Sequence, residues 1–207
     1  MVATTCLFVP TTRAVQIGDF GDHLAEHAEF LETVWNDSIA AGQPQYEIRV
    51  DSTADLEVPI SGRQIETALS RARRYIDEET SLHDRYHSVL VFDTFLYRYH
   101  GMAYIGTAGG PYGVGMIGLP LFKRTSAHEV GHLYGGNHAG HPDSTSTRWD
   151  STFQLGSRGE ARLMNSRLDY SCGGNRSFHW TGSWFSECTI DRVRTYIDEH
   201  IAGDGSD

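Results

Sequence analysis

The chain of 207 residues is long enough for one well-buried domain, or for two subdomains that share a core. Hydrophobic residues make up 39% of it and charged residues 21%, a composition that excludes a disordered chain. The formal net charge of −10 argues against nucleic acid and anionic membranes as partners, and no apolar run reaches the about 18 residues that a membrane span needs.

Strand and helix patterns alternate through the first eighty residues. Residues 5–9 read as a short strand, and apolar residues recur at helical spacing from Asp22 to Ile39. Residues 46–50 alternate as a strand, and residues 61–64 fit a capping box that opens a second helix. The apolar face of that helix consists of Ile65, Leu69, Ala72 and Ile76.

Three further strand patterns precede the most informative motif. Residues 88–92 form a continuous apolar run typical of a central strand, and strands are predicted over about 102–107 and 114–119. The turn-forming residues 109–112 separate the last two. The predicted order is therefore strand, helix, strand, helix and three strands, followed by one more helix.

That helix carries a metal-binding pattern, H-E-x-x-H-x-x-G-x-x-H, over residues 128–138. Side chains four apart share one helix face, so His128 and His132 point at a common position that suits zinc. Glu129 is close enough to reach a water there without binding the metal. Gly135 can adopt a positive φ, end the helix and reverse the chain, which would bring in His138 as the third ligand. A fourth position stays open, as a catalytic zinc requires.

This pattern resembles the signature of the metzincins, a group of zinc metallopeptidases with a methionine turn downstream. The resemblance implies an α+β fold: a twisted, mostly parallel five-stranded sheet carries two helices and the active-site helix. It places an upper subdomain at 1–138 and a smaller, irregular lower subdomain with one helix at 139–207, together one catalytic domain. Met164 follows His138 by 26 residues and matches the methionine turn.

Two weaker matches are closest to the adamalysin pattern. Residues 101–106 resemble its G-x-A-x-x-G segment, which implies an edge strand that pairs with substrate through Tyr104, Ile105, Gly106 and Thr107. Residues 185–189 resemble F-S-x-C-S before a final helix, which Thr189 would cap. The aspartate that follows the third histidine in adamalysins is replaced by Ala139, and Ser166 replaces the tyrosine of astacins, so the subfamily stays unassigned.

The chemistry implied is hydrolysis of peptide bonds by a zinc-activated water, with Glu129 as general base and then general acid. We expect a zinc-dependent endopeptidase with one catalytic zinc ion, acting on proteins or peptides; calcium is not indicated. Two alternatives stay open. One is a zinc-containing binding module with weak catalysis, which the intact Glu129 argues against. The other is an exopeptidase or dedicated processing peptidase, for which the sequence identifies no clamp for a substrate terminus.

The three cysteines bear on location. Cys172 and Cys188 enclose a short loop and are predicted to form a disulfide, whereas Cys6 in the first strand is predicted to be a free buried thiol. A persistent disulfide favours a secreted protein, although the sequence given carries no signal peptide and a cytoplasmic location stays open. We expect a monomer.

Overall fold

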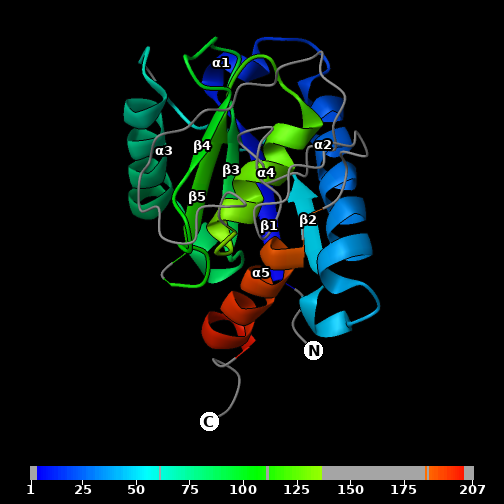
Figure 1. Ribbon diagram of the computed structural model, residues 1–207. Helices are drawn as coiled ribbons and strands as arrows, with labels where there is room; N and C mark the ends of the chain where they lie inside the picture. Colours follow the sequence, from blue (N-terminus) through cyan, green and yellow to red (C-terminus); the bar gives the residue numbers. More distant parts are fainter. Residues whose placement is uncertain (1–3, 61, 111, 137–184, 186, 203–207) are drawn as a thin grey trace.

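The computed structural model describes residues 4–60, 62–110, 112–136, 185 and 187–202. Its strands are β1 (Thr4–Pro10), β2 (Ile48–Ser52), β3 (Ser88–Phe92), β4 (Gly101–Ala103) and β5 (Gly113–Ile117). They form one sheet in the order β2-β1-β3-β5-β4 (Figure 1). All neighbours pair in parallel except β4, which lies antiparallel to β5 at the edge. The prediction of a mostly parallel five-stranded sheet with residues 88–92 at its centre is confirmed.

Five α-helices are described: α1 (Thr12–Val15), α2 (Phe20–Trp35), α3 (Ile65–Glu79), α4 (Lys123–Leu133) and α5 (Glu187–His200). A π-helical turn, Asn36–Ala40, continues α2, and short 3-10 turns occupy Pro44–Tyr46 and Leu82–Asp84. Within the described residues, no helix is long and apolar enough to cross a membrane.

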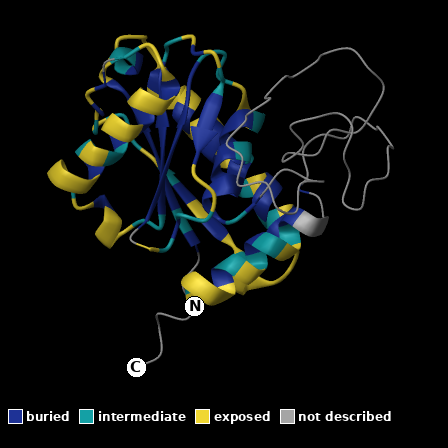
Figure 2. Cartoon of the chain, turned by 60° about the vertical axis from the view of Figure 1, so that its left-hand side comes forward, coloured by how far each residue is buried: buried dark blue, intermediate teal, exposed yellow. Residues whose placement is uncertain are grey.

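The sheet is buried on both faces, and its strands sort their side chains with a period of two. Cys6 and Phe8 of β1 join the core that contains α2, α4 and α5. Leu7 and Val9 of the same strand join the core that contains α3. Figure 2 shows the strands buried while the helices expose their outer sides. The continuous apolar run of β3 is explained in the same way, because each of its faces meets a helix layer.

Element boundaries depart from the sequence predictions at three places. The second strand begins at Ile48, because residues 44–46 form a 3-10 turn. The predicted capping box is wrong: Gln64 is itself the N-cap of α3, its backbone is extended, and its side chain makes no capping bond. The last helix begins at Glu187, so Thr189 lies inside it and is not its cap. Ile65, the first residue of α3, and Thr189, within α5, are each 1% exposed.

Candidate metal and catalytic site

Helix α4 lies directly against the sheet because the strands beneath it present small residues. A Cβ at Gly113 would come within 3.0 Å of Leu133 Cδ2, and one at Gly115 would come within 3.2 Å of the Ala103 Cβ. Most of α4 is buried, including Ala127, Val130 and Leu133. The helix is therefore held along β4 and β5, with its histidines at a fixed height over the edge of the sheet.

His128 and His132 lie side by side on α4, as their spacing predicts. Their Nε2 atoms are 3.1 Å apart. Two nitrogens bound to one tetrahedral zinc ion at about 2.0–2.1 Å would be roughly 3.3 Å apart, so the pair fits this ion with little adjustment. Without metal, a proton shared between the two nitrogens can occupy the same space. The geometry of these two side chains thus suits a zinc site.

The turn that ends α4 fixes the orientation of His132. Gly135 has φ of 81°, as predicted, and its N–H donates to His132 O at 3.0 Å, while Gly136 N–H donates to Gly131 O at 2.8 Å. These two bonds form a Schellman motif. The turn also places Gly136 O 2.7 Å from His132 Nδ1. A carbonyl only accepts, so Nδ1 carries the hydrogen and Nε2 of the neutral ring keeps its lone pair for a metal.

Glu129 is buried on the sheet side of α4, with 1% of its surface exposed. Its Oε2 has no hydrogen-bond partner among the described residues. The burial raises the pKa of the Glu129 carboxyl well above its usual range. A divalent cation beside it would act in the opposite direction and favour the charged form. Residues 126–129 also fit the S-x-x-E pattern of a capping box, in which Glu129 would fold back onto Ser126. That pairing is not seen, because α4 begins at Lys123 and the Ser126 hydroxyl donates to Lys123 O at 2.6 Å.

The segment predicted to be the substrate strand is a turn. β4 ends at Ala103, so Tyr104, Ile105, Gly106 and Thr107 lie outside the strand, and Gly106 has φ of 64°. Gly106 N–H donates to His132 O and Thr107 N–H to Leu133 O, at 2.9 and 3.0 Å. The carbonyls at the end of α4 have no partner within their own helix, so they bind the chain that follows β4 and turn it inward. The strand boundary was wrong, although the edge position of this strand was right.

The outward-facing groups of the edge strand can be assigned from its register. Gly118 N–H donates to His100 O at 2.8 Å, so the pair of His100 and Gly118 is hydrogen-bonded. In an antiparallel ladder, the backbone N–H and C=O groups of the residues next to such a pair point away from the partner strand. The backbone N–H and C=O groups of Gly101 and Ala103 therefore point away from β5, toward a side where no described strand pairs.

Helix α5 packs against the turn at the end of α4. The Cβ of Tyr196 lies 3.1 Å from the place that a Cβ on Gly135 would occupy, and the Tyr196 ring lies 3.3 Å from that place and from the corresponding place on Gly106. Its hydroxyl donates to Ala108 O. Tyr196 thus joins α5, the turn after β4 and the turn after α4. Its role was missed at the sequence level, since it lies outside the apolar face that predicts this helix, which consists of Ile190, Val193, Ile197 and Ile201.

Four predicted site residues lie outside the described part of the chain or have undescribed side chains: His138, Met164, Cys172 and Cys188. Among the described residues, no group of three or more histidine, cysteine, aspartate or glutamate side chains is arranged to hold a metal. The described part of the site is therefore the pair of His128 and His132 with Glu129 beside it. Cys6 is a free buried thiol, as predicted.

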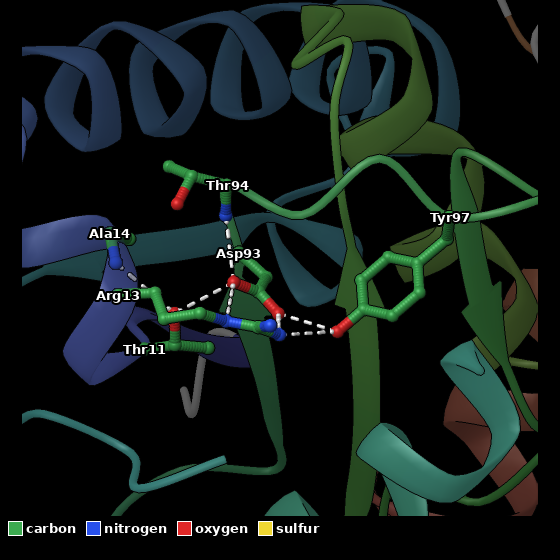
Figure 3. Close-up of polar contacts among 6 residues, drawn as sticks. All are labelled: Thr11, Arg13, Ala14, Asp93, Thr94 and Tyr97. Atoms are coloured by element: carbon green, nitrogen blue, oxygen red, sulfur yellow. Dashed lines mark hydrogen bonds and ion pairs between the residues drawn. The ribbon is translucent and has the colours of Figure 1, made fainter. Parts of the chain in front are cut away.

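A second buried carboxylate, Asp93, lies where β3 ends beside the end of β1 (Figure 3). Its Oδ1 accepts from Thr11 Oγ1 at 3.0 Å, Thr94 N at 2.8 Å and Arg13 Nε at 3.2 Å. Its Oδ2 accepts from Arg13 Nη2 and, at 2.5 Å, from the Tyr97 hydroxyl. This carboxylate is fully paired, which marks it as part of the framework.

Comparisons with known proteins support the fold alone. No family model matches the chain, and no curated protein matches it. The fold matches 105 chains of solved structures. One of them, from a structure described as a chaperone-substrate complex, aligns with 94% of this chain at a TM-score of 0.55 and 17% identity. The present chain covers 35% of that chain's length, and the low identity makes this a likeness of fold alone.

Proposed function

We propose that this chain is a zinc-dependent endopeptidase of the metzincin type, with His128, His132 and His138 as zinc ligands. The observation that carries the proposal is helix α4: it holds two imidazole nitrogens 3.1 Å apart and, at the residue after His128, a buried carboxyl oxygen with no hydrogen-bond partner among the described residues. A structural histidine pair would not require an unpaired buried carboxyl beside it. A hydrolytic site does require one, because the carboxyl must be open to a reacting water.

Each described residue has a task in this proposal. His132 is held by Gly136 O through Nδ1, so its Nε2 would be the atom that holds a zinc ion, and His128 from one turn earlier would be the second ligand. The chemistry that a bound zinc supplies is Lewis acidity, toward the scissile carbonyl and toward the attacking water. Glu129 takes one proton from that water as its oxygen bonds to the carbonyl carbon. It then gives the proton to the nitrogen as the carbon–nitrogen bond breaks.

The edge of the sheet offers a place for the peptide. The outward N–H and C=O groups of Gly101 and Ala103 can pair with an extended chain, which would add one strand beside β4. This moves the proposed docking strand from residues 104–107 to residues 101–103. A chain held along an edge is bound in its middle, so the proposal is cleavage within a peptide rather than at its end.

Further parts of the proposal depend on residues that the structure does not describe. A lower subdomain from residue 139 and Met164 below the zinc follow from the resemblance. A Cys172–Cys188 disulfide follows from the short loop that these two cysteines enclose, and secretion follows from the disulfide. Mass mapping under non-reducing conditions tests the disulfide directly, and finding both thiols free would remove the argument for secretion.

The experiment that tests the function compares the parent protein with Glu129→Ala at equal zinc content, on an unfolded protein and on peptides with free and blocked ends. We expect the variant to bind zinc in near-parental amounts and to lose at least about 10³-fold in turnover, since one residue serves both proton transfers. That loss corresponds to about 4 kcal/mol in the barrier.

The remaining outcomes separate the alternatives. Cleavage of blocked peptides by the parent supports the endopeptidase, whereas cleavage that requires a free end supports an exopeptidase. Zinc binding without any cleavage supports a binding module. Near-parental turnover in fully zinc-loaded Glu129→Ala would end the proposed mechanism.

A further inference from the structure

Gly101 is the residue of β4 that lies beneath Glu129. A Cβ built on Gly101 would lie 2.5 Å from Glu129 Oε1, 2.7 Å from Cγ and 2.8 Å from Cδ. Its backbone is that of an ordinary strand, without the positive φ that Gly106 and Gly135 have. Space, and not backbone conformation, is therefore what requires glycine here.

Other small residues under α4 make room for side chains other than Glu129. The Cβ positions of Gly113 and Gly115 approach Leu133, Leu90, Ala103, Ala108 and Thr107. Those contacts let the helix approach the sheet. At Gly101 the three nearest atoms all belong to Glu129. The missing side chain at this one position leaves the room in which the carboxyl lies.

We propose that Gly101 is a positioning residue for Glu129; this rests on the proposed function. The bare backbone of β4 forms one wall for the carboxyl, and α4 forms the other. A methyl group at residue 101 would move Glu129 Oε1 by about 0.9 Å, from 2.5 Å to the 3.4 Å of ordinary contact. A misplacement of about 1 Å in a catalytic site can reduce the rate about 10²-fold. The outward N–H and C=O of Gly101, which would meet substrate, stay as they are.

The first test is a double-mutant cycle in thermal stability, which needs no enzymatic activity. Gly101→Ala overpacks the site and should lower Tm by about 3–10 °C in the parent. In a Glu129→Ala background the clash is gone, so the same substitution should lower Tm little or raise it. Gly115→Ala is the matched control: it meets Leu90 and Ala103, and its effect should be the same in both backgrounds. Gly18→Ala meets nothing within 4 Å and should change little in either.

An equal loss of Tm from Gly101→Ala in both backgrounds would overturn the proposal. If Gly101→Ala does not fold alone, the double variant with Glu129→Ala should fold, and its failure to do so would overturn the proposal as well.

The second test is kinetic. Gly101→Ala should keep near-parental zinc content and KM within a few-fold, while kcat falls about 10²-fold. Gly18→Ala, whose added Cβ meets nothing within 4 Å, is the kinetic control and should keep kcat per folded molecule. A parental kcat in folded, zinc-loaded Gly101→Ala would overturn the positioning role. Failure of the proposed function would give a different result from failure of the positioning role. The parent would then cleave no peptide, while the double-mutant cycle in Tm would still report the contact of Gly101 with Glu129.

Discussion

Asp93 at the end of β3 and Glu129 in α4 are the two carboxyl groups buried among the described residues, with exposed fractions of 0% and 1%. Asp93 accepts five hydrogen bonds from Thr11, Arg13, Thr94 and Tyr97. Glu129 leaves Oε2 without a partner and lies against the bare backbone of Gly101. Both lie beside the same sheet, so depth alone does not explain the difference.

The difference lies in what each group does for folding. A buried carboxylate is tolerated when an opposite charge and hydrogen bonds replace its water shell, as Arg13 and its neighbours do for Asp93. An unpaired buried carboxyl opposes folding, so its retention points to a use other than stability. The pair therefore offers a direct contrast: removing Asp93 should damage the fold, and removing Glu129 should damage the chemistry.

The largest effect on stability is expected for Asp93→Ala. The substitution leaves the Tyr97 hydroxyl without its acceptor and leaves Arg13 with the Tyr97 oxygen in place of a carboxylate. Breaking a buried pair typically costs about 3–5 kcal/mol. Denaturant unfolding of the zinc-free protein measures this. Asp51→Ala is the control, because Asp51 also binds an arginine and a tyrosine but its side chain is 32% exposed. It should cost about 1 kcal/mol or less. Equal losses from both would break the contrast.

The His27 imidazole is expected to change the stability of the protein by an intermediate amount that depends on pH. This buried imidazole of α2 donates from Nδ1 to Ser126 of α4 at 3.1 Å, since the Ser126 hydrogen is used by Lys123 O. Burial first, and then Lys123 and His23, lower the pKa of His27 from 6.5 to about 4, against the opposing effects of a hydrogen bond to the Leu121 backbone and of Glu26. The unfolded chain therefore binds more protons between these two pH values. Stability is full above pH 6.5 and falls by up to about 3 kcal/mol as the pH drops to 4.

His27→Gln should flatten this acid slope in the zinc-free protein. Replacing the exposed His23 on the same helix by Gln removes only a lesser cause of the lowered pKa of His27, so it should flatten the slope much less. Unfolding measured at several pH values between 4 and 7 gives the slopes. An unchanged slope in His27→Gln would show that the α2–α4 contact does not depend on a neutral imidazole.

Glu129→Gln should give the smallest change in the free energy of unfolding, and this change should be a gain in stability rather than a loss. The amide keeps the shape of the side chain and removes a group whose charged form is poorly solvated, so the zinc-free protein should gain about 1 kcal/mol near pH 7. Denaturant unfolding beside Asp93→Ala makes the contrast explicit. A loss of several kcal/mol instead would mean that Glu129 belongs to the framework, and the argument for a catalytic carboxyl would lose its basis.

The local features that the sequence determined are those that depend on neighbours along the chain. The spacing of His128 and His132 puts two nitrogens on one helix face, and Gly135 has the positive φ needed to end that helix. The continuous apolar run of residues 88–92 predicted a central strand, and β3 has a helix layer on each of its faces. Each of these follows from a helical or strand period that acts over a few residues, whatever the rest of the chain does.

The tertiary structure decided what lies opposite each local feature. Residues 104–107 read as strand because Tyr104 and Ile105 favour it, yet the open carbonyls of His132 and Leu133 bind that segment as a turn. The room for Glu129 comes from Gly101, 28 residues earlier in the chain, and the tautomer of His132 comes from Gly136 O. No local pattern encodes which glycine lies under which carboxyl. That pairing depends on the distance at which α4 packs against the sheet, and the small residues of β4 and β5 together set this distance.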